Sequence, residues 1–87
     1  MSSEEWFVYI LCCSDKSLYC GIAKDVQKRL QLHNDGKGAK FTRGRTPCAV
    51  VWQCSAPLSH GDALRRERQI KRMSRHEKMT LIESTQH

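Results

Sequence analysis

Residues 6–34 have the sequence WFVYILCCSDKSLYCGIAKDVQKRLQLHN, and this stretch decides the fold. Residues 6–13 are apolar and rich in aromatic and β-branched types, which predicts a strand. The polar residues 14–17 predict a turn, and residues 18–23 predict the returning strand of a hairpin. Because the first strand is apolar on both of its faces, we expect it to be central in a sheet and covered on both sides.

After residue 23 the sequence predicts helices, a loop and a further strand. Asp25 is placed to cap a helix that Asn34-Asp35-Gly36 would end. The order ββαβαα with a hairpin start predicts an α/β (α+β) fold, with helices packed on a small three-stranded mixed sheet in a single domain spanning residues 1–87. The expected segments are a helix over 26–34, a glycine-rich basic loop over 36–47, a strand over 48–54, a helix over 61–73 and a last short helix opened by the capping box Ser74-x-x-Glu77.

Several features concern where the protein works. No apolar run approaches the roughly 20 residues of a membrane span, and the N-terminal MSSEEW is too acidic and polar for a secretory signal peptide. Five cysteines are an odd number, and in a reducing compartment free buried thiols are expected. No pair has CxxC spacing, and no histidine lies at a zinc-like distance from a cysteine. We therefore expect a cytoplasmic protein with reduced cysteines.

The positive charge is concentrated in two segments. The formal net charge is +6, and eleven of the 15 lysines and arginines fall within residues 37–45 and 65–78. Such clustering favours binding of a polyanion such as nucleic acid. The alternative is a solvated helix face together with a flexible basic loop. The cations expected to contact DNA are Lys37, Lys40, Arg43, Arg45, Arg68 and Lys71.

Glu67 is a carboxylate in an unexpected place. It occupies the middle of the stripe that Ala63 and Ile70 form on the predicted helix. A carboxylate near a buried seam costs free energy unless it is paired or ligates a cation. Glu67 could pair with Lys71 one turn along the helix, or with Arg29. It could also ligate a hard metal such as Mg²⁺, which usually takes one or two carboxylates and keeps several waters.

Two tyrosines, an arginine and a histidine recur at a regular spacing. Tyr9 and Tyr19 lie on the two strands of the hairpin, and Arg29 and His33 lie one turn apart on the helix after it. Cleavage of a phosphodiester needs a group that activates the nucleophile and a group that stabilises charge in the transition state. A tyrosine can act as general base if a metal or a cation lowers its pKa. Strand packing and a solvated helix face are the simpler explanations of the same residues.

The ordered set of residues resembles the GIY-YIG nuclease superfamily over about residues 6–80. Phe7-Val8-Tyr9 stands at the GIY motif and Tyr19-Cys20-Gly21 at the YIG motif. Arg29 matches the helix arginine of the family and Glu67 matches its metal-binding glutamate. The stretches HND-GKGAK-FTRGR-P and ALRRERQIKR resemble the small stand-alone bacterial branch, whose role is generally unassigned.

This resemblance implies a DNA endonuclease with one Mg²⁺ or Mn²⁺ ion. A structure-specific enzyme that acts in DNA repair or processing would fit it. It implies that Tyr9 is the general base or orients the attacking water, and that Tyr19 assists by hydrogen bonding. It further implies that Arg29 neutralises charge on the phosphate, that His33 supports the phosphate or relays a proton, and that Glu67 holds the metal.

Three departures from the family pattern leave other functions open. Phe7 replaces the glycine of GIY, Ile22 follows Gly21 where some repair relatives carry a lysine, and no asparagine follows Glu67. A slow or partner-dependent nuclease would fit these departures, with a protein partner supplying specificity. The alternatives are a nucleic-acid-binding module with a vestigial site, and a subunit that positions another nuclease. The oligomeric state is not indicated by the sequence.

Overall fold

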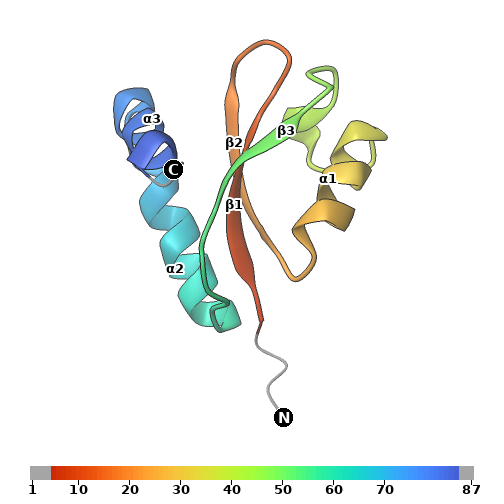
Figure 1. The fold of residues 1–87 in the computed structure, drawn as a ribbon. Helices are drawn as coiled ribbons and strands as arrows, with labels where there is room; N and C mark the ends of the chain where they lie inside the picture. The colour runs from red at the N-terminus through yellow and green to blue at the C-terminus, as the bar shows by residue number, and fades with distance from the viewer. Residues whose placement is uncertain (1–4, 85–87) are drawn as a thin grey trace.

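The computed structural model describes residues 5–84, and the order of its main elements is ββαβαα, as the sequence predicts (Figure 1). A short 3₁₀ helix, η1, interrupts the basic loop. The elements are β1 (Phe7–Cys12), β2 (Leu18–Ala23), α1 (Val26–Asn34), η1 (Lys40–Thr42), β3 (Ala49–Gln53), α2 (His60–Lys71) and α3 (Arg75–Ser84).

The three strands form one sheet in the order β2-β1-β3, with β1 in the centre as expected. Both strand pairs are antiparallel, so the expectation of a mixed sheet is wrong. The reason is the direction of the long loop. It returns the chain to the end of β1 near Cys12, which pairs with Ala49, and β3 then runs back along β1.

The sheet is covered on both faces, with α1 on one side and α2 and α3 on the other (Figure 1). Because side chains of a strand alternate between faces, β1 contributes to two separate cores. Val8 and Ile10 pack with Ala63 and Ile70 of α2, whereas Tyr9 belongs to the core on the α1 side. Tyr9 therefore lies on the face that carries α1, and Glu67 belongs to a helix on the other face.

The helix ends follow the local sequence signals. The Asp25 side chain accepts a hydrogen bond from the Lys28 amide (3.0 Å), which caps α1. Gly36 follows α1 with a positive φ of 76°, a conformation that glycine adopts at low cost. The Ser74–Glu77 capping box is present in both directions, with N–O distances of 2.8 and 3.1 Å. The predicted bounds of α1 and the predicted start of α3 are correct, because these signals depend on neighbouring residues.

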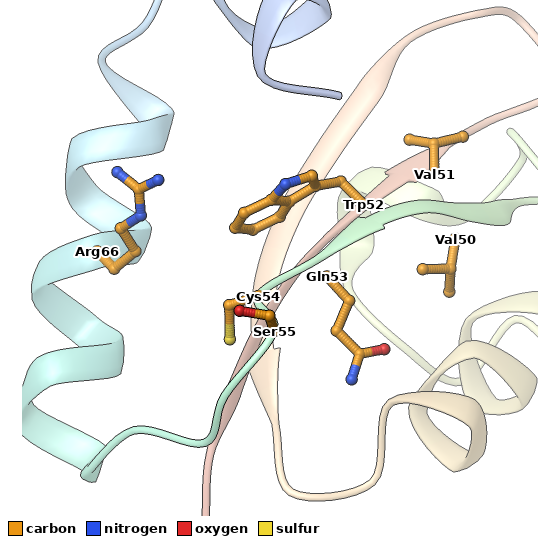
Figure 2. Close-up of a pocket in the computed structure, with 7 residues that line it drawn as sticks. All are labelled: Val50, Val51, Trp52, Gln53, Cys54, Ser55 and Arg66. Carbon is orange, nitrogen blue, oxygen red and sulfur yellow. The ribbon is translucent and has the colours of Figure 1, made fainter. Parts of the chain in front are cut away.

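The outer edge of β3 and α2 frame a cleft of about 540 Å³ (Figure 2). The Trp52 side chain extends from β3 toward α2, and the Arg66 guanidinium lies 5.9 Å from its ring centre. The Trp52 indole N–H is buried and has no hydrogen-bond partner within residues 5–84. Since β2 and β3 are opposite edges of the sheet, this cleft is separate from the residues around Tyr19.

All five cysteines are free, as expected. The Cys48 thiol donates to the Cys13 sulfur at 3.2 Å, and both side chains are buried. Within residues 5–84 no three metal-ligating side chains of histidine, cysteine, aspartate or glutamate cluster together. Over the same residues, the helices are too short or too polar to cross a membrane.

Candidate active site

The hairpin and α1 bring two phenols and an imidazole together. The Tyr9 hydroxyl and His33 Nε2 lie 3.0 Å apart, and both side chains are almost completely buried. The Tyr19 ring lies 6.4 Å from the Tyr9 ring and 5.2 Å from the His33 ring, measured between ring centres. Tyr9, Tyr19 and His33 therefore form one aromatic cluster, which is called the phenol–imidazole cluster below.

The basic loop holds the far side of the His33 ring. His33 Nδ1 lies 2.9 Å from the Thr42 hydroxyl, which itself donates to the Ala39 carbonyl at 2.9 Å. The Ala39 amide donates toward the same Nδ1 at 3.3 Å. Thr42 is completely buried, so these contacts fix the plane of the imidazole ring.

Two proton arrangements are possible, and each satisfies a different part of these contacts, because Nδ1 either donates to Thr42 or accepts from Ala39. In one, Nδ1–H donates to Thr42 and Nε2 accepts the phenolic proton of Tyr9. In the other, Nδ1 accepts from the Ala39 amide and Nε2–H donates to the phenolic oxygen of Tyr9. In the second arrangement the Tyr9 hydroxyl can donate to a further group. The pair can thus exchange roles as proton donor and acceptor without moving a side chain.

Burial determines the protonation states in this cluster. It raises the pKa of Tyr9 well above 10, with the neighbouring Tyr19 phenol adding to the effect, and it raises the pKa of Tyr19. Burial, followed by the charge of Arg29, lowers the pKa of His33 below 6.5. At neutral pH both phenols are protonated and the imidazole is neutral. In the free protein Tyr9 is therefore a proton donor or relay and not a phenolate.

Arg29 and Glu67 influence the phenols through their charges. The guanidinium of Arg29 lowers the pKa of both tyrosines, and the carboxylate of Glu67 raises it. Burial, followed by Glu67, also raises the pKa of Cys20, on the face of β2 that points to α2, to about 12. Arg29 belongs to α1 and Glu67 to α2, so the two charges are carried by helices on opposite faces of the sheet.

Glu67 already has a partner in the structure. Its carboxylate lies 3.3 Å from Lys71 Nζ, so the pairing considered from the sequence is present. The Glu67 side chain is 17% exposed and that of Lys71 is 53% exposed. The alternative pairing with Arg29 is not among the ion pairs of residues 5–84. Glu67 is therefore a half-buried carboxylate that one flexible lysine covers.

Two glycines make the cluster possible. Gly21 is the direct partner of Tyr9 in the β1–β2 pair, and a Cβ at position 21 would lie 2.7 Å from the Tyr9 hydroxyl oxygen. A Cβ at Gly38 would overlap the His33 ring. The sequence motif contains Gly21, but the roles of Gly38 and Thr42 were not predicted. The glycine-rich composition of residues 36–47 was the one signal that could have drawn attention to them.

The basic loop also reaches Tyr19. The Phe41 ring stacks on Tyr19 with ring centres 5.9 Å apart, and the Arg45 guanidinium lies 4.4 Å from the centre of the Phe41 ring. Arg45 Nε donates to the Phe41 carbonyl, and Arg45 Nη1 pairs with Asp15 at 2.6 Å. Arg45, which we expected to contact DNA, is therefore engaged in holding the loop against the hairpin turn.

The other cations expected to contact DNA differ in their surroundings. Lys71 pairs with Glu67. The remaining four, which are Lys37, Lys40, Arg43 and Arg68, have exposed side chains. Arg68 also lines a groove on the outer face of α2 together with Arg65 and Arg72.

Comparison with known proteins tests the family resemblance that the sequence motifs indicate. A family model described as the GIY-YIG catalytic domain matches residues 5–80. The chain belongs to the GIY-YIG family. It is 45% identical over 80 residues to the UPF0213 protein OB0043 of Oceanobacillus iheyensis, covering 92% of each chain. It is 40% identical over 81 residues to a UPF0213 protein of Nitratidesulfovibrio vulgaris, covering 93% of this chain and 73% of the relative.

A solved structure agrees with this membership. The chain resembles the UPF0213 protein BH0048 of Bacillus halodurans, known from solution NMR, with a TM-score of 0.60 and 42% sequence identity. The alignment covers 93% of this chain and 85% of that one. The names of these relatives state no activity or substrate. They place the chain in a group of small GIY-YIG proteins whose role is unassigned.

The positions that depart from the GIY-YIG pattern have structural roles here. Phe7 packs against the core that contains Tyr9, and Ile22 packs against the core on the α2 side. The only asparagine, Asn34, donates to the Cys48 carbonyl at 3.1 Å and accepts from the Cys48 amide at 2.7 Å. Asn34 therefore joins the end of α1 to the start of β3 and is not the asparagine that follows the metal glutamate in relatives.

Proposed function

We propose that the protein is a metal-dependent endonuclease that hydrolyses phosphodiester bonds of DNA. The observation that supports this proposal best is the buried hydrogen bond between Tyr9 and His33, with the charges of Arg29 and Glu67 acting on the same phenol. A purely structural tyrosine needs one hydrogen-bond partner but no arginine and carboxylate of opposite sign beside it. Membership of the GIY-YIG family raises the weight of this explanation.

In this proposal the phenol–imidazole cluster accepts the proton of the attacking water. Tyr9 hydrogen-bonds the water, and His33 accepts the phenolic proton in the arrangement where its Nε2 is free of hydrogen. Tyr19 donates a hydrogen bond to the phosphate or to Tyr9. Arg29 stands on the exposed side of α1, where it neutralises charge that develops on the phosphate oxygens.

The metal would be held by Glu67. A single carboxylate with waters and phosphate oxygens is a usual way of binding Mg²⁺ or Mn²⁺, and Glu67 supplies that carboxylate near the phenols. When bound, such an ion supplies a Lewis acid for the phosphate oxygens. Lys71 has to leave Glu67 for this, and its exposed ammonium is then available to a DNA phosphate.

The test is cleavage by the purified full chain on plasmid, single-stranded and branched DNA, with Mg²⁺, with Mn²⁺ and with EDTA. We expect product with either ion and none with EDTA. DNA binding without cleavage on all three substrates would contradict the proposal. We also propose a cytoplasmic location, a single functional domain and specificity supplied in part by DNA structure or by a protein partner.

The second candidate is a nucleic-acid-binding module whose nuclease site is vestigial. The Glu67–Lys71 ion pair favours it, because a carboxylate that already has a partner gains less from a metal ion. Measuring the binding of Mn²⁺ distinguishes the two candidate functions. Binding of Mn²⁺ that is lost in Glu67→Gln, but kept in a control Glu83→Gln at an exposed position of α3, supports the nuclease.

A further inference from the structure

Beside Arg29 the surface contains a second cavity, of about 240 Å³, that the phenol–imidazole cluster does not use. It lies between the start of β1 and the outer face of α1. Trp6, Ala23 and Leu32 supply apolar lining, and Lys24, Lys28 and Arg29 supply three cations. Asp25 also lines it, but its carboxylate is used to cap α1.

The size and lining of this cavity fit one aromatic ring system with a phosphate on either side. Pockets that enclose drug-sized ligands measure about 300–1,000 Å³, so this cavity suits a smaller planar group. Leu32 is 39% exposed and belongs to neither core, which leaves an apolar floor open to solvent. Apolar or aromatic surface with a cationic rim is the combination that binds single-stranded nucleic acid, because bases stack while phosphates pair with lysine and arginine.

Arg29 connects this cavity with the candidate active site. It lines the cavity, and its charge also acts on Tyr9, Tyr19 and His33. Arg29 is therefore shared by the cavity and the candidate active site, so a phosphate held by its guanidinium would border both. The nucleotide next to that phosphate could then reach the cavity that Trp6 and Leu32 line.

A second exposed apolar side chain, Phe41, adjoins the cluster. Phe41 is 41% exposed and stacks on Tyr19. Leu32 and Phe41 are the large apolar side chains that residues 5–84 expose most. Leu32 precedes His33 in α1 and Phe41 stacks on Tyr19, so each adjoins a member of the phenol–imidazole cluster.

From these observations we infer that the cavity binds an unpaired nucleobase of the nucleotide adjacent to the phosphate at Arg29. This inference rests on the proposed function, since it assumes that a nucleic acid phosphate lies at Arg29. It specifies the substrate as a strand with at least one unpaired base at the site. A base within an intact duplex cannot enter, because its edges are paired and its faces are stacked.

Lys24 lines the cavity beside Trp6. Its ammonium lies 5.4 Å from the centre of the Trp6 ring, and the His60 ring packs against Trp6 at a tilt, with centres 4.6 Å apart. Trp6 is half-buried and packs against the core on the α2 side, whereas Lys24 is exposed, so the cation is held on the ring only weakly. A base that stacks on Trp6 displaces Lys24, whose ammonium can then pair with the adjoining phosphate.

The experiment measures binding without metal, so it does not depend on cleavage. A short single-stranded oligothymidine with one 2-aminopurine, a fluorescent adenine analogue, is titrated with the full chain, and the same base is also placed in a fully paired duplex. We expect the fluorescence of the single strand to be quenched by stacking in the cavity. Leu32→Glu introduces a carboxylate into the apolar lining of the cavity. Gln31→Glu makes the same change of charge one residue away, at an exposed position of α1.

We expect Leu32→Glu to weaken binding of the single strand by roughly 10-fold or more, and Gln31→Glu by no more than about 3-fold. On the duplex the two variants should behave alike. Trp6→Phe should retain part of the quenching that Trp6→Ala loses, provided that thermal melting shows both variants folded. Equal losses for Leu32→Glu and Gln31→Glu on the single strand would overturn the inference.

The outcomes separate this inference from the proposed function. Quenching that depends on Leu32, in a protein that never cleaves DNA with metal, would uphold the nucleobase site and contradict the nuclease. Metal-dependent cleavage that Leu32→Glu and Gln31→Glu affect equally would uphold the nuclease and contradict the nucleobase site.

Discussion

Gly21 lies directly opposite Tyr9 in the sheet, and the Tyr9 phenol crosses the space that a side chain at position 21 would fill. A Cβ there would stand 2.7 Å from the hydroxyl oxygen and 2.9 Å from the ring carbon that bears it. The glycine of the second motif is thus a packing requirement of the tyrosine of the first. This relationship explains why the two motifs occur together on one hairpin.

We predict that Gly21→Ala lowers cleavage sharply and costs about 1–3 kcal/mol of unfolding free energy, because the Tyr9 ring must move away from His33. Gly61→Ala is the matched control, since a Cβ at position 61 meets only the Arg65 side chain, at 3.9 Å. Chemical denaturation and the DNA cleavage assay measure the two effects. Equal behaviour of the two variants would show that Gly21 has no special role.

We predict that Thr42→Val destabilises the protein by about 1–3 kcal/mol, because the buried Nδ1 of His33 loses its hydroxyl partner. Thr42→Ser keeps the hydroxyl and is expected to recover most of that loss. Thr42 is a positioning residue, so the variant should also change the pH dependence of cleavage through His33. A pH profile identical to that of the unaltered protein would contradict this role.

The free energy of unfolding should decrease as the pH is lowered, because of His33. Its pKa is lowered in the folded state, so between that value and the unfolded value of 6.5 the unfolded chain binds more protons. The contribution of neutral His33 is therefore complete above pH 6.5 and is lost as the pH falls below it. Thermal melts from pH 7.5 to pH 5 should show this loss, and it should shrink in His33→Gln but persist in a control His76→Gln at an exposed position of α3.

The exposed cations of the basic loop should determine how DNA binding depends on salt. Replacing Lys37, Lys40 and Arg43 by alanine should weaken binding to all sequences alike and flatten the slope of log K against log salt by up to about 2.7 on duplex DNA. Arg45→Ala should instead reduce thermal stability, because it breaks the contacts to Asp15 and Phe41. An unchanged slope in the triple variant would place the DNA elsewhere, along the arginines of α2.

The sequence predicted the parts of the fold that depend on neighbouring residues. The Asp25 cap, the Ser74–Glu77 capping box and the central apolar strand are all in the structure. The direction of β3 was missed because it depends on the path of a long loop. That loop contacts α1 through His33–Thr42, nine residues apart, and the hairpin turn through Asp15–Arg45, 30 residues apart.

In the candidate site, too, the features set by nearby residues could be predicted and those set by distant contacts could not. Its motif residues could be named from their spacing, and the Glu67–Lys71 pair followed from helix geometry. The raised pKa values of the tyrosines could not be foreseen, since they arise mainly from burial between the hairpin, α1 and the loop. Arg45 looks like any other cation of the loop in the sequence, and only the fold shows its tether to Asp15.

The central claim is that Glu67 and the phenol–imidazole cluster cleave DNA together with a divalent metal ion. The most direct measurement is the cleavage rate and the DNA affinity of Glu67→Gln, both determined on one folded preparation with Mg²⁺ or Mn²⁺. We predict a rate that falls by roughly 10²–10³-fold, with an affinity within about 3-fold of the unaltered protein, because the carboxylate contributes mainly in the transition state. An unchanged rate, or a rate and an affinity that fall together, would contradict the account.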